Sequence, residues 1–167
     1  MSTETNISTK KIWSILEQVT DPEVPVLSII DLGIVRGVNC HENGETEVII
    51  TPTYTGCPAM DVIRMNIRMM LLQHGYENVK ITTVLSPAWT TDWMSEAGKE
   101  KLQAYGIAPP NAKPQICETA LFAEEAVQCP HCRSYNTRRI SEFGSTACKS
   151  LYQCNECQEP FDYFKCH

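Results

Sequence analysis

The sequence predicts an α/β layer domain in the first two thirds of the chain, followed by a small module organised around a metal ion. Over residues 1–108, segments with helical spacing of apolar residues alternate with short β-branched segments. A proline-rich stretch at 108–114 then interrupts the pattern. Two Cys-x-x-Cys pairs, separated by twenty-one residues, follow within the last forty positions. Four cysteines with this spacing are typical of a zinc ribbon.

The first helix is expected between a polar N-terminal segment and the Asp21-Pro22 step. Ser8 or Thr9 can cap its start, because a hydroxyl oxygen there accepts a backbone N–H. Proline disfavours helical geometry in the residue before it, so the helix should end ahead of Pro22. The apolar residues between these limits recur at helical spacing: Ile12, Ile15, Leu16 and Val19.

The remaining elements of this domain are expected in the order strand, strand, helix, strand, helix. Asn43-Gly44 is a turn signal between the two strands, and Pro58 suits a first helical position. Gly75 and Gly106 are expected to close the two helices. The expected ranges are a strand within 24–38, a strand over 45–51, a helix over 58–75, a strand over 79–85 and a helix over 92–105.

Composition places the domain boundaries and limits the function classes. We expect an α/β domain at 1–108, a linker at 109–127 and a zinc-ribbon domain at 128–167. The formal net charge is −6, which argues against a nucleic-acid partner because such partners select basic surfaces. The polar N-terminus and the lack of a long apolar run predict a cytoplasmic protein without a membrane partner. A homodimer stays open.

Nine cysteines in a reducing compartment are read first as metal ligands or reactive thiols, not as disulfides. The two Cys-x-x-Cys pairs predict a structural zinc site with four thiolate ligands: Cys129, Cys132, Cys154 and Cys157. Thiolates also suit iron, so zinc and iron both remain open here. Cys148 and Cys166 lie close by in the sequence and could enlarge or replace this ligand set.

Cys57 is the second candidate. It follows a predicted strand and a Thr/Gly loop and comes just before the proline that begins a predicted helix. Backbone N–H groups at a helix N-terminus favour a thiolate, so Cys57 could be reactive or metal-binding. The alternative is a small apolar residue packed under the first turn.

Two further features carry weaker signals. Asp21 and Glu23 flank a proline in a loop, where they could bind a cation or only mark the end of a helix. Trp89 and Trp93 are four residues apart and would share one face of the helix expected at 92–105. Core packing and partner docking both fit that pair, since tryptophan is favoured at protein interfaces.

Several of these segments resemble known families. Asp21-Pro-Glu, Asp31-Leu-Gly-Ile-Val and Thr51-Pro-Thr-Tyr-Thr-Gly-Cys57-Pro resemble the SufT-like family of iron–sulfur assembly proteins. The segments AWTTDWM, SEFGSTACK and EPFDYFKC, in chain order from Ala88, look like the PaaD family (also called PaaJ) of bacterial phenylacetyl-CoA epoxidase systems. The resemblance spans the chain from about Trp13 to Cys166.

The resemblance implies a SufT-like α/β layer domain with a C-terminal zinc ribbon, and an accessory role in aerobic phenylacetate degradation through ring 1,2-epoxidation. It implies help in maturing an iron–sulfur or di-iron centre of the reductase or oxygenase component of the epoxidase. Cys57 would receive or transfer iron or a cluster, bound transiently, with Asp21 and Glu23 tuning its surroundings. The alternative is a structural or regulatory subunit that stays bound in the epoxidase complex.

An enzymatic role is not expected. Di-iron oxygenases place Glu and Glu-x-x-His ligands on bundle helices, and this chain has no Glu-x-x-His and only four histidines. A thiol–disulfide oxidoreductase would use one Cys-x-x-Cys pair after a strand, not two at ribbon spacing. We therefore expect a monooxygenase accessory subunit that acts in metal-centre maturation, not a catalyst.

Overall fold

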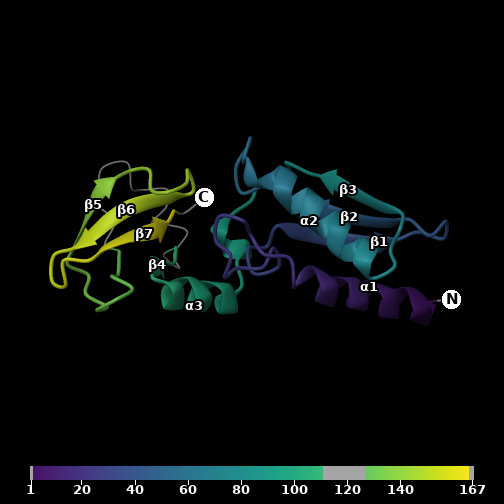
Figure 1. Ribbon diagram of the computed structural model, residues 1–167, viewed down its shortest axis with the longest axis horizontal. Helices are drawn as coiled ribbons and strands as arrows, with labels where there is room; N and C mark the ends of the chain where they lie inside the picture. The colour runs from purple at the N-terminus through teal and green to yellow at the C-terminus, as the bar shows by residue number, and fades with distance from the viewer. Residues whose placement is uncertain (1, 111–126, 166–167) are drawn as a thin grey trace. The chain divides into compact units, whose positions relative to one another are not determined.

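A computed structural model describes residues 2–110 and 127–165 of the chain, with side chains described from Thr9 onward (Figure 1). The chain packs into two compact units. Unit 1 comprises Met1–Trp89 and Trp93–Ser95, and unit 2 comprises Thr90–Asp92 and Glu96–His167. No helix in the described part of the chain is both apolar enough and long enough to span a bilayer. Each unit has its own sheet.

Unit 1 is a three-stranded sheet with two helices. Its sheet has the order β1-β2-β3, with β1 and β2 antiparallel and β2 and β3 parallel (Figure 1). The parallel pair is joined through α2, as a crossover between parallel strands requires. The elements are α1 (Ser2–Leu16), β1 (Val35–Cys40), β2 (Thr46–Ile50), α2 (Ala59–Gln73) and β3 (Val79–Thr83).

The core of unit 1 lies between α1, α2 and the sheet. α1 contacts both β1 and α2, and α2 contacts β3. The helices contribute their apolar faces at helical spacing, and β2 contributes the side chains that alternate inward. The fully buried members of this core include Ile12, Leu16, Val48, Ile50, Ile63, Ile67 and Leu71.

The ends of α2 explain why the loop before it is well defined. Pro58 occupies the N-cap position, as the sequence predicts. At the other end Gly75 has φ +86°, and the Tyr76 N–H donates to the Leu71 carbonyl at 3.0 Å. Left-handed geometry and this long backward bond form a C-terminal cap that favours glycine. The helix therefore has fixed limits at both ends.

Unit 2 contains α3 and the cysteine-bearing strands. Its sheet has the order β4-β7-β6-β5, in which β4 is parallel to β7 and the other pairs are antiparallel. The elements are α3 (Glu96–Tyr105), β4 (Ile107–Ala108), β5 (Thr137–Ser141), β6 (Lys149–Cys154) and β7 (Pro160–Phe164). Tyr152, Phe161 and Tyr163 pack their rings together in its core.

The packing divides the chain earlier than composition does. We expected a boundary at 108, but α3 contacts β4 and β4 pairs with β7, so both belong to unit 2. The reason is that β4 adds an edge strand to the ribbon sheet, and a two-residue pairing leaves no pattern in the sequence. Most of the expected linker, 111–126, lies outside the described residues.

Two helix predictions need correction. α1 begins at Ser2, ahead of the expected cap, and ends at Leu16, where the Val19 N–H bonds back to the Leu16 carbonyl in a tight turn. The helix expected over 92–105 starts only at Glu96. Ser95 donates through both its backbone N–H and its hydroxyl to Asp31, which holds the chain in a non-helical path up to that point.

Candidate functional site

The four ribbon cysteines come from two loops with matching backbone geometry. In each Cys-x-x-Cys loop, the residue after the second cysteine has positive φ, 63° at Arg133 and 64° at Gln158. In each loop, the N–H of the first cysteine donates to the carbonyl of the residue five positions later. The glutamine before each loop, Gln128 or Gln153, donates its side-chain amide to the carbonyl of the positive-φ residue, at 3.0 and 3.1 Å. The protein backbone thus forms two copies of one thiolate-presenting turn.

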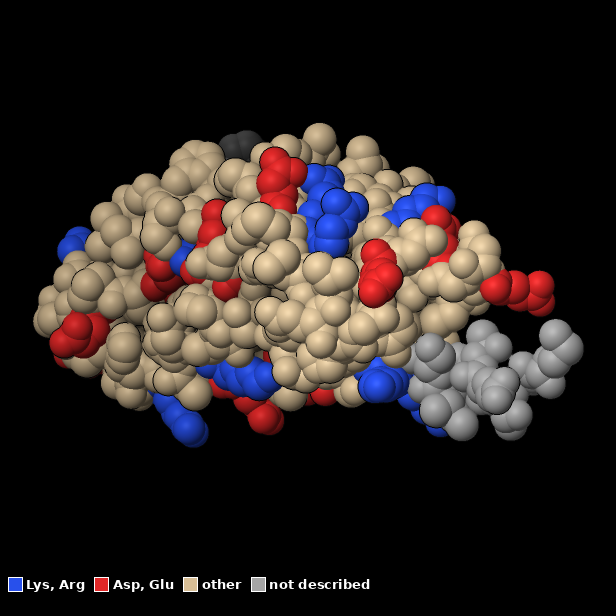
Figure 2. All heavy atoms as spheres, turned by 45° about the vertical axis from the view of Figure 1, so that its right-hand side comes forward, with Lys and Arg blue, Asp and Glu red and all other residues tan. Residues whose placement is uncertain are grey.

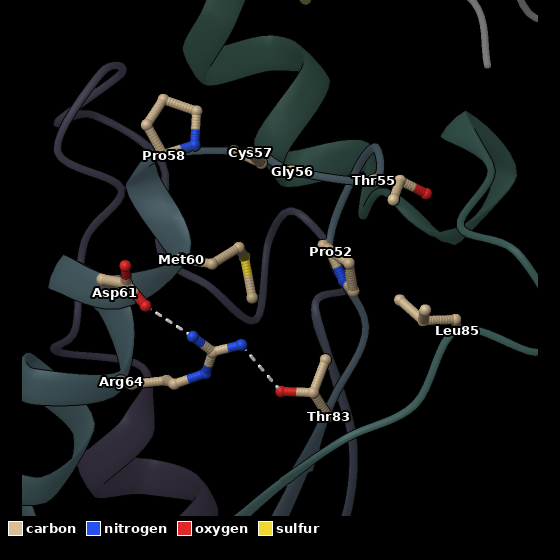
Figure 3. Close-up of a pocket in the computed structure, with 10 residues that line it drawn as sticks. All are labelled: Pro52, Thr55, Gly56, Cys57, Pro58, Met60, Asp61, Arg64, Thr83 and Leu85. Carbon is tan, nitrogen blue, oxygen red and sulfur yellow. Dashed lines mark hydrogen bonds and ion pairs between the residues drawn. The ribbon is translucent and has the colours of Figure 1, made fainter.

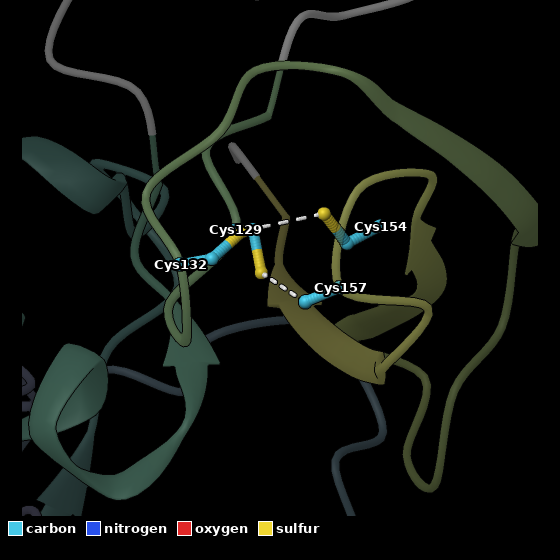
Figure 4. Close-up of side chains that lie close together, drawn as sticks. All are labelled: Cys129, Cys132, Cys154 and Cys157. Carbon is cyan, nitrogen blue, oxygen red and sulfur yellow. Dashed lines mark hydrogen bonds between the residues drawn. The ribbon is translucent and has the colours of Figure 1, made fainter.

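The sulfur atoms of these loops meet at one point. Cys129, Cys132, Cys154 and Cys157 have their Sγ atoms all within 4.8 Å of one another (Figure 4). The Cys129–Cys157 pair lies at 3.8 Å and the Cys132–Cys154 pair at 3.5 Å. A tetrahedral zinc ion with bonds of about 2.3 Å separates its sulfur ligands by about 3.8 Å. The four side chains therefore fit zinc, and zinc would hold the two loops together.

The proton affinities of these thiols reflect their crowding. The Cys157 backbone N–H lowers the pKa of Cys154 to about 7, against the effect of burial. The Glu159 N–H also favours the Cys157 thiolate, but burial and the neighbouring thiols outweigh it and raise the Cys157 pKa to about 12. The Ser134 N–H is likewise outweighed at Cys132, whose pKa lies above its ordinary value. A bound cation is what lets all four thiols ionise together.

The two cysteines considered as additional ligands do not join this cluster in the described structure. Cys148 is buried, and its Sγ lies 3.0 Å from the Thr146 hydroxyl. It is not among the residues whose ligand atoms converge. The expectation that Cys148 enlarges the ligand set is therefore wrong, because β6 directs it to a separate place in the ribbon. Cys166 lies outside the described residues.

Cys57 lies in the loop that connects β2 to α2. The loop tightens as the Cys57 N–H donates to the Tyr54 carbonyl at 3.3 Å, and the Cys57 carbonyl accepts from the Met60 N–H at 3.2 Å. Gly56 has φ +83°, so the chain reverses immediately before the cysteine. The Cys57 side chain is half-buried. This exposure fits a thiol that a ligand can reach better than a core residue.

Cys57 contributes to the wall of a hollow of about 470 Å³ (Figure 3). Met60 and Arg64 project from α2 into the same region, facing Pro52 and Thr83. The guanidinium of Arg64 donates to Asp61 at 2.6 Å and to the Thr83 hydroxyl at 3.0 Å. Cys57, Asp61 and Arg64 thus repeat at the spacing of one helix face, a signal that our sequence reasoning overlooked.

A second polar group near this loop was also missed. The Thr51 hydroxyl is buried, with the residue 1% exposed, and it has no hydrogen-bond partner among the described residues. Thr51 lines a smaller hollow of about 70 Å³ together with Tyr54, Thr55 and Trp89. An unsatisfied buried hydroxyl costs about 1–3 kcal/mol. A polar group that entered this hollow would remove that cost.

Asp21 and Glu23 do not line either hollow. The Asp21 carboxylate is buried, and one of its oxygens accepts from the Glu23 and Val24 N–H groups at 2.7 and 2.9 Å. These bonds organise the turn after α1, which favours the helix-end interpretation for Asp21. A role for Asp21 and Glu23 in tuning Cys57 stays a prediction.

Trp89 and Trp93 do not share a helix face, so that expectation is wrong. Trp89 lies ahead of a short 3₁₀ helix (Thr91–Trp93) and is 4% exposed, with its indole N–H donating to the Leu32 carbonyl at 2.8 Å. A residue this buried is a core residue and not a docking residue. Trp93 is half-buried beneath the Arg36 guanidinium, 3.4 Å from its ring centroid.

Comparisons with known proteins divide the chain in the same way. Residues 9–83 match the family model described as iron–sulfur cluster assembly protein, and residues 113–165 match the model described as PaaD zinc beta ribbon domain. A solved Domain of Unknown Function DUF59 from Bacillus anthracis shares 27% identity and covers 61% of this chain and 97% of its own, with a TM-score of 0.57. The class of protein is therefore an iron–sulfur cluster assembly domain joined to a zinc ribbon.

The particular family follows from longer matches. A protein of Escherichia coli, named "Putative 1,2-phenylacetyl-CoA epoxidase" with the letter D for its place among the subunits, is 51% identical over 93% of this chain and 92% of its own length. The chain belongs to this PaaD family of epoxidase subunits. Over about half of the chain, it is also similar to Fe-S protein maturation auxiliary factors. That of Porphyromonas gingivalis is 38% identical over 51% of this chain and 81% of its own, and YitW of Bacillus subtilis is 35% identical over 54% and 88%.

Proposed function

We propose that this chain is a maturation factor, not a catalyst, for a metal centre in a phenylacetyl-CoA epoxidase system. In this proposal Cys57 receives iron or an iron–sulfur cluster and passes it to the reductase or the oxygenase component. The observation that carries the proposal is the half-buried Cys57 on the wall of a hollow of about 470 Å³. It lies within the region that matches the iron–sulfur cluster assembly model.

The surroundings of Cys57 suit an anionic cargo. Backbone N–H groups at the start of α2 and the Arg64 guanidinium both favour negative charge, and a thiolate-ligated cluster is negatively charged. Asp61 already pairs with Arg64, so the wall is only mildly cationic. A mild attraction fits a carrier, because a carrier has to release what it binds.

The transfer is a ligand exchange without a change of oxidation state. The Cys57 thiol loses its proton to solvent, and its sulfur forms a bond to iron. When a thiolate or carboxylate of the recipient takes that position at the iron, the Cys57–iron bond breaks and the thiolate takes up a proton again. Neither step needs an external oxidant or reductant.

The zinc ribbon has a structural role in this proposal. Its four thiolates would fill a tetrahedral shell, and a filled shell offers no open position for transfer. Cargo exchange is therefore assigned to Cys57 in unit 1, and the metal of unit 2 remains in place during the cycle.

The proposal is tested with Cys57→Ser in cells that express the whole epoxidase system. We expect iron and acid-labile sulfide in the purified reductase, or iron in the oxygenase, to fall several-fold, while the variant keeps its own zinc and fold. Cys40→Ser is the matched control, because Cys40 is also a half-buried cysteine of unit 1 but lies in β1. Unchanged metal content in both components would remove Cys57 from the mechanism.

The alternative is a structural or regulatory subunit that stays bound to the epoxidase. The name of the Escherichia coli relative, which counts it among the subunits, favours this alternative. The two functions differ in stoichiometry: a permanent subunit co-purifies with mature oxygenase at a fixed ratio, whereas a maturation factor is lost once the metal centre is complete.

A further inference from the structure

We propose that the outer face of α2 is a docking surface for an acidic amphipathic helix of a partner protein. This face carries Val62, Met65, Met69 and Leu72, which we call the α2 stripe. The four side chains are 39%, 59%, 52% and 50% exposed. Their spacing of three, four and three residues places them in one line along the helix. Such a line is the pattern that a second helix recognises.

The α2 stripe is not a random scatter of apolar side chains. Among the described residues of unit 1, the large hydrophobic side chains that are exposed are these four and Leu85, which follows β3. The opposite face of α2 buries Ile63, Ile67 and Leu71 in the core. The helix is therefore apolar on two faces, and folding of unit 1 needs only one of them. Exposed methionines are also common on surfaces that bind helical partners.

A groove runs beside the α2 stripe. A hollow of about 290 Å³ is lined by Arg64, Met65 and Arg68 from α2 and by Ile81 from β3. Uncharged side chains form most of the face shown in Figure 2, with Lys and Arg in small separate groups. The hollow therefore offers an apolar floor with two guanidinium groups at its edge.

Charge selects the kind of partner. The chain as a whole is acidic, with a net charge of −6, yet the groove contains two arginines. Arg64 is paired with Asp61 on its own helix, while Arg68 is exposed. A partner helix with apolar residues in a line and Glu or Asp beside them complements both features. Complementary flanking charges also set partner choice between helices.

A second copy of this chain is a poorer occupant. An antiparallel copy of α2 that places Met65 opposite Met69 brings Arg68 close to its own counterpart. Like charges at such positions destabilise helix pairs. A heterologous partner with acidic flanks meets no such repulsion, so the charges favour another protein over self-association.

The docking surface adjoins the cargo site. Arg64 lines both the groove beside the α2 stripe and the hollow that contains Cys57. A helix bound along the stripe would therefore lie next to the thiol from which cargo leaves. The identification of this partner with an epoxidase component rests on the proposed function, whereas the surface itself rests only on its shape and charge.

The test uses the full chain and two synthetic helical peptides. Both peptides carry leucine in an a/d line, and they differ only in having Glu or Lys at the flanking positions. We expect the Glu peptide to bind about tenfold more tightly than the Lys peptide, and Met65→Lys/Met69→Lys to weaken it about tenfold or more. The matched control is Tyr135→Lys/Ile140→Lys, which removes two equally exposed apolar side chains from unit 2 and should leave binding unchanged.

Every outcome decides the proposal. Equal binding of the two peptides, or full binding by the Met65→Lys/Met69→Lys variant, would overturn it. A stable dimer of the wild-type chain that this variant dissociates would also overturn it, since the occupant would then be a second copy. If the peptides behave as expected but neither purified epoxidase component competes with the Glu peptide, the docking surface stands and the proposed recipients are wrong.

Discussion

The ribbon cysteines and Cys57 set the same side chain in two contrasting environments. In unit 2, four thiols converge within 4.8 Å and belong to two loops with the same backbone bonds. In unit 1, Cys57 is half-buried on the wall of a hollow, and no other described cysteine lines that hollow. The first arrangement satisfies a metal completely with protein ligands. The second leaves most of a metal's coordination sphere to other molecules.

This contrast separates a structural metal from a transported one. A closed tetrahedral shell exchanges its metal slowly and contributes to folding. A single thiolate beside a polar hollow contributes little to folding and can bind and release. The two units also differ in what stabilises them, because unit 1 has an apolar core of helices on a sheet whereas the small ribbon is held by its cysteine loops.

The largest expected effect comes from breaking the ribbon site. Cys129→Ser or Cys154→Ser removes a fully buried ligand, and we expect the ribbon to lose its zinc and unfold. All three tryptophans, Trp13, Trp89 and Trp93, belong to unit 1. Tryptophan fluorescence therefore reports unit 1 alone, while zinc analysis reports unit 2. The variant should change the zinc content and leave the tryptophan unfolding transition within about 0.5 kcal/mol of wild type.

Chelation of the wild-type protein should reproduce this result without any substitution. The informative failure is a ribbon that stays folded after its zinc is removed, measured by protection of its backbone from proteolysis. That outcome would show that the aromatic cluster around Tyr152 suffices to fold unit 2, and the distinction between the units would disappear.

The next effect should run in the opposite direction. Gly33 has φ +66°, and a Cβ placed there would collide with the backbone carbonyl of Trp93. We expect Gly33→Ala to lower the free energy of unfolding of unit 1 by about 2–5 kcal/mol, from backbone strain and overpacking together. The measurement is denaturant unfolding followed by tryptophan fluorescence, with zinc content expected to stay at the wild-type level.

Gly44→Ala is the control for this experiment. Gly44 has a similar φ of +80°, but nothing lies within 4 Å of the position of an added Cβ. Its loss should therefore be limited to about 1 kcal/mol of backbone strain. Equal losses for the two variants would mean that the contact with Trp93 does not limit the packing of unit 1.

The sequence predicted the ribbon site better than it predicted the surroundings of Cys57. Ligand spacing along the chain determines which cysteines form two short turns, so the four zinc ligands are readable from local pattern alone. The Arg64 position relative to Cys57 is also local, and helical spacing could have found it. Thr51 was beyond reach, because its hydroxyl is orphaned only once Tyr54 and Trp89 close around it.

The fold shows the same division between local and distant causes. The strands and α2 were predicted within a few residues, since turn residues and periodicity set them. The late start of α3 depends on hydrogen bonds from Ser95 to Asp31, sixty-four residues away along the chain. The pairing of β4 with β7 is equally distant. Long-range contacts of this kind override helix signals and leave no local trace.

The smallest expected effect is a pH dependence confined to unit 1. Glu47 on β2 accepts from the Thr82 hydroxyl at 2.6 Å and from the Asn39 amide at 3.2 Å, and it lies 3.4 Å from the Lys80 ammonium. These contacts, Thr82 first, lower its pKa from 4.5 to about 2. A carboxylate with a depressed pKa stabilises the fold above its unfolded value, and this contribution is lost as the pH falls from about 4.5 toward 2.

The measurement is the tryptophan-detected melting temperature between pH 6 and 2.5, for wild type and for Glu47→Gln. We expect wild type to be the more stable protein at pH 6 and the difference to shrink steadily below about pH 4.5. Acid also releases zinc by protonating thiolates, but that loss belongs to unit 2 and does not reach the tryptophan signal. Parallel curves for the two proteins would show that Glu47 does not link β2 to its neighbouring strands. A matching acid transition in zinc content and fluorescence would instead mean that the two units unfold together.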